Sequence, residues 1–154
     1  MEYLGNISLL YQPKHGFLCS RNTKSSVILP CLDWAVECAK GNEPVMSTFH
    51  SEMEEAVLDM LIAGSCPIIL VLGRSIYKKL PERLQPLMDD NRLLIVSIAD
   101  PLRISRESAF VSNQYICNNS TTITFGFLSQ ESSLFPLYEE AQAKGMTVNV
   151  ITKI

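Results

Sequence analysis

The sequence predicts a three-layer α/β protein with a mostly parallel sheet of about six strands. Short apolar runs alternate with segments of helical length, and most of these runs are continuously apolar. Continuous runs are typical of strands that helices cover on both faces. Regular alternation of strand and helix indicates right-handed crossover connections. The predicted strands are 16–20, 44–48, 67–72, 93–97, 121–127 and 147–151.

The clearest predicted helix begins after Ser51. Ser51 and Glu54 match a capping box, in which the two residues satisfy each other's backbone N–H groups. Gly64 is a natural end for this helix. The apolar stripe that faces the core is Met53, Val57, Met60 and Leu61. We interpret the acidic residues of the first turn as structural, because they complement the helix dipole.

Three further helices are predicted within 25–40, over 105–119 and near 133–144. The segment 78–92 is less regular, because Pro81 and Pro86 exclude one uninterrupted helix. The sequence contains no internal repeat, low-complexity tract or linker. We therefore expect residues 1–154 to form a single domain.

Composition and charge narrow the classes of partner. The chain has 154 residues, 47% of them hydrophobic, and a net charge of −3. A broad basic surface for duplex DNA is therefore not expected. No segment approaches the ~20 apolar residues that span a bilayer, and the N-terminus lacks the pattern of a signal peptide. We expect a cytoplasmic protein without membrane contact.

The five cysteines predict buried free thiols. Their number is odd, no pair has C-x-x-C spacing, and the two histidines, His15 and His50, are isolated. Metal sites need clustered ligands. We therefore expect neither a metal site nor a cofactor.

Small polar and basic residues follow the predicted strands. In a parallel sheet, ligands bind outside the carboxyl ends of the strands. Hydroxyl groups, helix N-termini and guanidinium groups all donate hydrogen bonds to anions such as phosphate. The alternative is structural, with serines as helix caps, Gly73 as a turn residue and the arginines solvated or ion-paired. The candidate ligand-binding residues are Ser20, Arg21, Ser47, Thr48, Gly73, Arg74, Ser132 and Ser133.

Signatures of common enzymes are missing. The chain has no G-x-G-x-x-G, no G-x-x-x-x-G-K-[ST] and no G-x-S-x-G motif. The loop SQESSL, after the fifth predicted strand, contains no glycine to cradle a phosphate. Its Glu131 would repel one. The loop therefore argues against tight nucleotide binding at that point, and the missing motifs argue against the common enzyme classes.

Several segments resemble the DNA-processing protein A (Smf) family. LGNISLLYQPKHGFLCSR is similar to the family's "GN-x-x-LL…P…GSR" run, and VLGRSIYKKLP to its "VLG…YP" stretch. STFHSEMEEAVLDMLIAG resembles "SGFHSPMEKE-LL-LLL-G" of short bacterial members. The family's "RNR" turn falls on Ser112, Asn113 and Gln114. The resemblance covers essentially the whole chain.

This resemblance implies a Rossmann-like fold of the wider lysine-decarboxylase-like nucleotide-binding group. It also implies a homodimer that binds single-stranded DNA in a positive pocket, and it adds Asn113 to the candidate ligand-binding residues. Cys19 replaces the glycine of "GSR", and Ser112 and Gln114 replace two arginines. Each lost arginine removes a phosphate contact and its salt-dependent affinity.

Three functions remain open. The first is a non-enzymatic binding module that holds a nucleotide or a short single strand at the carboxyl edge of the sheet. The second is a degenerate structural or interaction protein with a vestigial pocket. The third is a nucleotide-directed hydrolase, for which only Glu139 and Glu140 remain near the position of the relatives' glycine-rich loop and glutamate.

Overall fold

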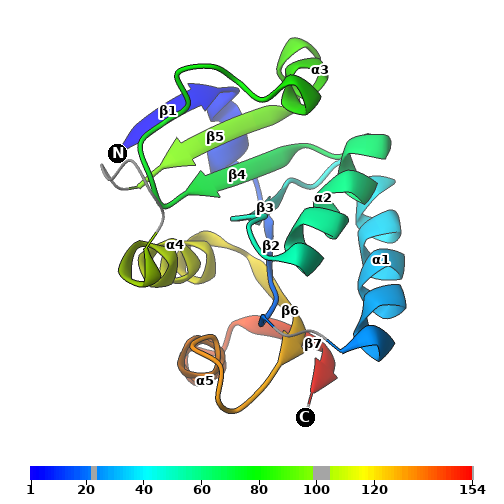
Figure 1. Ribbon diagram of the computed structural model, residues 1–154, viewed down its shortest axis with the longest axis vertical. Coiled ribbons are helices and arrows are strands. Elements are labelled where there is room, and N and C mark those ends of the chain that lie inside the picture. The colour runs from blue at the N-terminus through cyan, green and yellow to red at the C-terminus, as the bar shows by residue number, and fades with distance from the viewer. Residues whose placement is uncertain (22–23, 99–104, 154) are drawn as a thin grey trace.

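A computed structural model shows one seven-stranded sheet with helices on both faces (Figure 1). The structure describes residues 1–21, 24–98 and 105–153. The strand order is β1-β5-β4-β3-β2-β6-β7, and every neighbouring pair is parallel except β1 and β5. This arrangement confirms the predicted three-layer α/β class. The strands are β1 (Glu2–Gly5), β2 (His15–Leu18), β3 (Val45–Ser47), β4 (Ile68–Leu72), β5 (Leu93–Ser97), β6 (Thr122–Leu128) and β7 (Thr147–Lys153).

Strand β1 was not predicted from the sequence, and neither was the 3₁₀ helix at Ile7–Tyr11. The six predicted segments correspond to β2 through β7, whereas β1 lies at the edge of the sheet and pairs antiparallel with β5. All four residues of β1 are exposed. It therefore lacks the continuous apolar run that marks a strand covered on both faces. Its position depends on backbone pairing with a segment about ninety residues away, from Glu2 to Ser97.

The predicted helices are confirmed with small changes at their ends. The capping box of α2 is present, since Glu54 N donates to Ser51 Oγ and Ser51 N donates to the Glu54 carboxylate, both at 3.3 Å. Segment 78–92 forms a short 3₁₀ turn and a short helix rather than one long helix. In the described part of the chain, no helix is long and apolar enough to cross a membrane. The helices are η1 (Ile7–Tyr11), α1 (Ser25–Ala39), α2 (Glu52–Ala63), η2 (Glu82–Leu84), α3 (Gln85–Asp89), α4 (Arg106–Asn119) and α5 (Phe135–Ala143).

Two apolar cores hold the layers together, one on each face of the sheet. Alternate residues of β4 show the division: Ile68 and Leu70 pack with α1 and α2, whereas Ile69 and Val71 pack with α4 and α5. Figure 1 shows these two helix pairs on opposite sides of the sheet. All five residues of β4 are buried. Burial on both faces is why the strand sequence is continuously apolar.

Gly64 lies where the C-terminal ends of α1 and α2 meet. The N–H groups of Ser65 and Cys66 donate to the carbonyl oxygen of Ala39 at 2.8 and 3.2 Å. A Cβ atom on Gly64 would lie 2.6 Å from that oxygen and would also overlap the Ala39 side chain. This position requires glycine because the two backbones approach closely.

The Gly64→Ala substitution should lower the free energy of unfolding by about 2 kcal/mol, because the added methyl group must push two helix ends apart. Urea denaturation followed by circular dichroism measures this change. Gly41→Ala is the matched control, since a Cβ atom there has its nearest neighbour at 3.5 Å. Equal stability losses for the two variants would contradict this account of Gly64.

Candidate functional site

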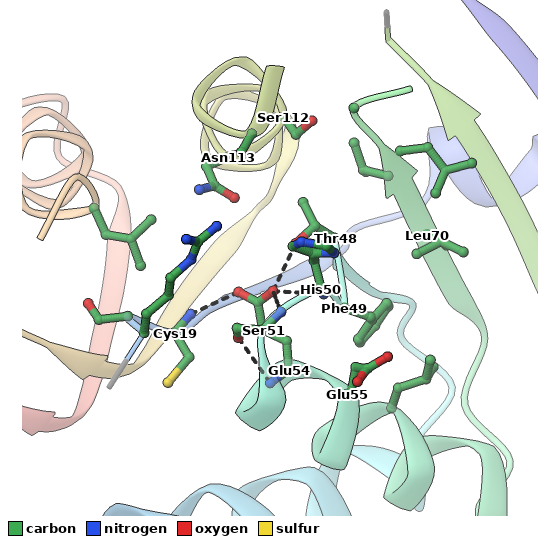
Figure 2. Close-up of a pocket in the computed structure, with 18 of the residues that line it drawn as sticks. Cys19, Thr48, Phe49, His50, Ser51, Glu54, Glu55, Leu70, Ser112 and Asn113 are labelled. Atoms are coloured by element: carbon green, nitrogen blue, oxygen red, sulfur yellow. Dashed lines mark hydrogen bonds between the residues drawn. The ribbon is translucent and has the colours of Figure 1, made fainter. Parts of the chain in front are cut away.

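A cavity of about 990 Å³ lies at the carboxyl ends of β2, β3, β4 and β6. The strand ends, the start of α2 and one side of α4 form its walls (Figure 2). Strand ends that are distant in sequence meet here because parallel strands all finish at the same edge. Of the nine predicted site residues, eight line this cavity: Ser20, Arg21, Thr48, Gly73, Arg74, Asn113, Ser132 and Ser133.

Ser47 is the ninth predicted site residue, and it lies beneath the cavity rather than in its wall. Its side chain is fully buried, and its hydroxyl oxygen accepts a hydrogen bond from Phe49 N at 3.1 Å. Phe49 has a φ of 48°, in the left-handed region that a bulky residue rarely occupies. The Ser47 hydroxyl therefore helps to hold a strained turn at the end of β3.

Glu54 is at the centre of the site, and its role is larger than the one the sequence suggested. The residue is only 4% exposed. One carboxylate oxygen accepts hydrogen bonds from Thr48 Oγ1 at 2.8 Å, His50 N at 3.1 Å and Ser51 N. The other accepts a hydrogen bond from Cys19 N at 3.1 Å. Figure 2 shows these contacts converging from the ends of β2 and β3.

This arrangement makes Glu54 a structural brace. A carboxylate has about four lone-pair sites, and four donors occupy the Glu54 carboxylate. Three of these donors are backbone N–H groups, which stabilise the buried negative charge without a cation. The capping box predicted the local contact with Ser51. The contact with Cys19 has no sequence signal, because the two residues are 35 positions apart.

Hydroxyl groups connect the ends of β2 and β6. Ser20 Oγ donates to Ser132 Oγ at 2.8 Å, and Ser132 Oγ accepts a hydrogen bond from Leu134 N at 3.1 Å. Ser132 thus supports the turn before α5, as a capping residue would. Arg21 is exposed beside these hydroxyls, and no carboxylate among the described residues forms an ion pair with it. This wall of the cavity presents donors to an anion.

The opposite wall is built around Gly73 and Arg74. A Cβ atom on Gly73 would lie 2.7 Å from Ser112 Oγ, so glycine allows α4 to approach the end of β4. The Arg74 guanidinium lies over the Tyr77 ring, 5.5 Å from its centroid. In Figure 2, Asn113 extends from α4 on the side of the cavity opposite Glu54. This wall combines a cation, an aromatic ring and an amide.

Positive charge exceeds negative charge in the cavity walls, although the chain as a whole has a net charge of −3. The acidic lining residues are Glu54, Glu55 and Glu131. The basic lining residues are Arg21, Lys24, Arg74, Arg83 and Arg106. Because the backbone donors already stabilise the Glu54 carboxylate, the walls are suited to an anionic ligand.

The cysteines are free thiols, as predicted. Cys38 is half-buried, and the other four are buried. Burial raises the pKa of Cys38 and that of Cys117 to about 12. A hydrogen bond with Cys19, followed by burial, raises the pKa of the Cys31 thiol. These three thiols are therefore protonated at neutral pH and are poor nucleophiles.

A parallel sheet with a ligand-sized cavity at the carboxyl ends of its strands defines the Rossmann-like class of binding folds. Within that class, the chain has the fold of DNA processing protein A. The protein from Streptococcus pneumoniae superimposes with a TM-score of 0.76 at 18% identity, over 96% of this chain and 53% of that one. The protein from Helicobacter pylori superimposes with a TM-score of 0.74 at 16% identity, over 96% of this chain and 69% of that one.

The resemblance inferred from sequence is thus confirmed for the fold. This chain spans about half the length of the Streptococcus pneumoniae protein. The Helicobacter pylori structure concerns a single-stranded DNA binding mode of that protein. No protein-family model and no curated protein matches the sequence.

The Glu54→Ala substitution should destabilise the protein by about 3 kcal/mol, because it leaves the buried N–H group of Cys19 and the partly buried N–H groups of His50 and Ser51 without their acceptor. Chemical denaturation measures the loss, and the amide NMR signals of Cys19 and His50 should shift together. Glu52→Ala is the control, since Glu52 is an exposed carboxylate in the first turn of the same helix. A Glu54→Ala protein as stable as the Glu52→Ala protein would show that the brace is unimportant.

Proposed function

We propose that this chain is a non-enzymatic binding module for single-stranded nucleic acid or a nucleotide. The observation that carries the proposal is the excess of basic residues around a cavity in an otherwise acidic chain. Phosphate is an anion that guanidinium and hydroxyl donors recognise well. The single-stranded DNA binding mode of the structurally similar Helicobacter pylori protein supports the ligand class.

In this proposal, a phosphate group binds beside Arg21. The exposed guanidinium can form two parallel hydrogen bonds to phosphate oxygens. Lys24, Ser20 and Ser133 also line the cavity and add charge or hydroxyl groups. Asn113, on the opposite wall, can donate or accept hydrogen bonds with a sugar or a base.

The shape of the site favours a single strand over a duplex. Duplex DNA is bound by a broad basic surface, whereas here the basic residues surround a concave cavity. A single strand exposes the faces of its bases, which stack on aromatic rings and on guanidinium groups. Tyr77 with Arg74, together with the partly exposed Phe110, offers such surfaces in the lining.

The proposal includes no hydrolysis. Glu139 and Glu140 lie on α5, outside the cavity lining, and Glu140 forms an ion pair with Lys144 at 2.9 Å. We also propose that residues 1–154 act as one cytoplasmic domain that forms a homodimer. Ile28, Leu29 and Val36 on α1 are exposed apolar residues that suit a contact between two copies.

Wild-type protein should bind a short fluorescein-labelled oligothymidylate at low salt, and Arg21→Ala should weaken binding by about tenfold through loss of a charge-assisted contact. Fluorescence anisotropy measures the affinity. The slope of log K against log[salt] should become shallower by about one for this variant.

Lys40→Ala is the control, because Lys40 is an exposed cation that pairs with Glu37 and does not line the cavity. It should leave the affinity within about twofold of wild type, since a screened, distant charge contributes little. If wild-type protein binds neither the oligothymidylate nor thymidine monophosphate at low salt, the proposed function is wrong.

A further inference from the structure

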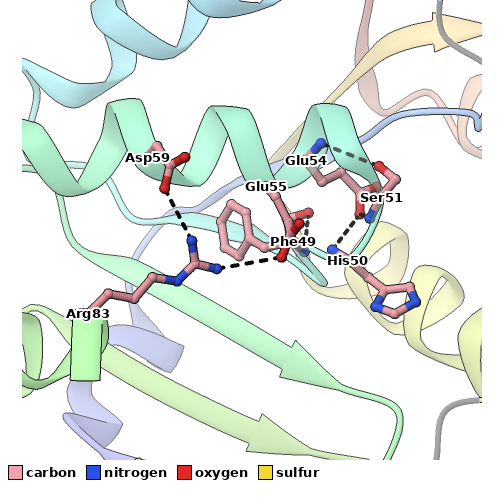
Figure 3. A network of polar contacts seen from close by, with 8 residues as sticks. Phe49, His50, Ser51, Glu54, Glu55, Asp59 and Arg83 are labelled. Atoms are coloured by element: carbon pink, nitrogen blue, oxygen red, sulfur yellow. Dashed lines mark hydrogen bonds and ion pairs between the residues drawn. The ribbon is translucent and has the colours of Figure 1, made fainter. Parts of the chain in front are cut away.

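Arg83 is a cavity residue whose charge is neutralised by the protein itself. It lies in η2, and its guanidinium contacts two carboxylates of α2. Arg83 NH1 lies 3.1 Å from Asp59 Oδ1, and NH2 lies 3.7 Å from Glu55 Oε1. Figure 3 shows the arginine side chain reaching across to this helix.

The two carboxylates contact the guanidinium nitrogens in the way that two oxygens of a phosphate group would. Glu55 and Asp59 are one helical turn apart, so both face the same side of α2. Each contacts a different terminal nitrogen of Arg83. The fork of a guanidinium group matches two oxygens of a carboxylate or a phosphate. A phosphate that approached from the cavity would compete for the same nitrogens.

The ion pairs of Arg83 with Glu55 and Asp59 are exposed to solvent, so Arg83 can readily exchange these carboxylates for another anion. The side chain of Arg83 is 46% exposed, and those of Glu55 and Asp59 are 55% and 60% exposed. Ion pairs exposed to this extent are weak and are screened by salt. The buried Glu54 carboxylate, by contrast, is held by four donors and does not pair with Arg83. Arg83 can therefore change partner without disturbing the brace.

Arg21 and Arg83 belong to different parts of the cavity lining. Arg21 directly follows β2, whereas Arg83 lies in η2, in the segment between β4 and β5, and contacts α2. Both residues line the same cavity. Two phosphate groups of one strand could therefore be held at separate points.

We propose that Arg83 is a masked contact for a second phosphate group of the bound strand, and that Glu55 and Asp59 occupy its guanidinium until that phosphate displaces them. The inference rests on the proposed function, because it concerns the same cavity and the same class of ligand. It makes the site selective for ligands with more than one phosphate. An oligonucleotide can reach both arginines, whereas a nucleoside monophosphate engages Arg21 alone.

A double-mutant cycle tests this inference. The first change is Glu55→Gln with Asp59→Asn, which removes both negative charges and keeps the side chains similar in shape. The second is Arg83→Ala, and the triple variant combines them. Fluorescence anisotropy measures binding of an oligothymidylate, and thymidine monophosphate serves as a competitor to measure single-phosphate affinity. Glu52→Gln controls for the general loss of negative charge on α2.

The paired Gln and Asn changes should tighten oligothymidylate binding by about fivefold when Arg83 is present. In the Arg83→Ala background, the same Gln and Asn changes should alter the affinity by less than about twofold. If the two carboxylates act through Arg83, their removal has no effect once Arg83 is absent. Arg83→Ala alone should weaken oligonucleotide binding and leave the affinity for thymidine monophosphate unchanged. Glu52→Gln should resemble wild type.

An equal gain in both backgrounds, or a gain equal to that of Glu52→Gln, would overturn the role of Arg83 and leave the proposed function intact. If Arg83→Ala weakens the binding of the oligonucleotide and of thymidine monophosphate equally, the proposed role of Arg83 is also wrong. Failure of wild-type protein and all variants to bind either probe would overturn both proposals.

Discussion

The site depends on one buried carboxylate. Glu54 joins the end of β2 to the turn after β3 through hydrogen bonds from Cys19, Thr48, His50 and Ser51. Without this acceptor, the buried N–H group of Cys19 would have no partner, which is costly, and the partly buried N–H groups of His50 and Ser51 would lose theirs. The same contacts hold Phe49 in its left-handed conformation, because residues on both sides of it are fixed. The positions of Ser20, Arg21 and Thr48 in the cavity wall follow from this brace.

The acidic residues of α2 have three different physical roles, although the sequence presents them as one charged run. Glu54 is buried and committed to backbone donors. Glu55 and the following Asp59 are half-exposed and neutralise a cavity arginine. Glu52 is exposed in the first turn, where it complements the helix dipole. Burial separates these roles: it makes the contacts of Glu54 strong and leaves those of Glu55 and Asp59 exchangeable. A cavity that is basic in composition can therefore carry less free positive charge than its arginines suggest.

The sequence predicted the features that arise from local pattern or from parallel strands. Strands β2 to β7 were recognisable because both of their faces are buried, and eight candidate residues line the cavity because parallel strands end at one edge. Strand β1 was missed, since its residues are exposed and give no apolar run, although they pair with β5. Ser47 and Thr48 both come at the end of β3, so the sequence marked both as site residues. The side chain of Ser47, however, is fully buried. The contacts of Glu54 with Cys19 and of Arg83 with α2 join segments far apart in the chain, and no local spacing encodes them.

In the proposed complex, a single strand binds in the cavity between Arg21 and Arg83. A titration of ¹⁵N-labelled protein with unlabelled oligothymidylate, followed by amide NMR spectra, tests it most directly. Binding there should give the largest shifts at the amides of Cys19, Thr48, His50, Gly73 and Asn113, while amides of β7 and of the outer face of α1 should change little. Shifts concentrated on β7 or α1, or no shifts at low salt, would contradict it.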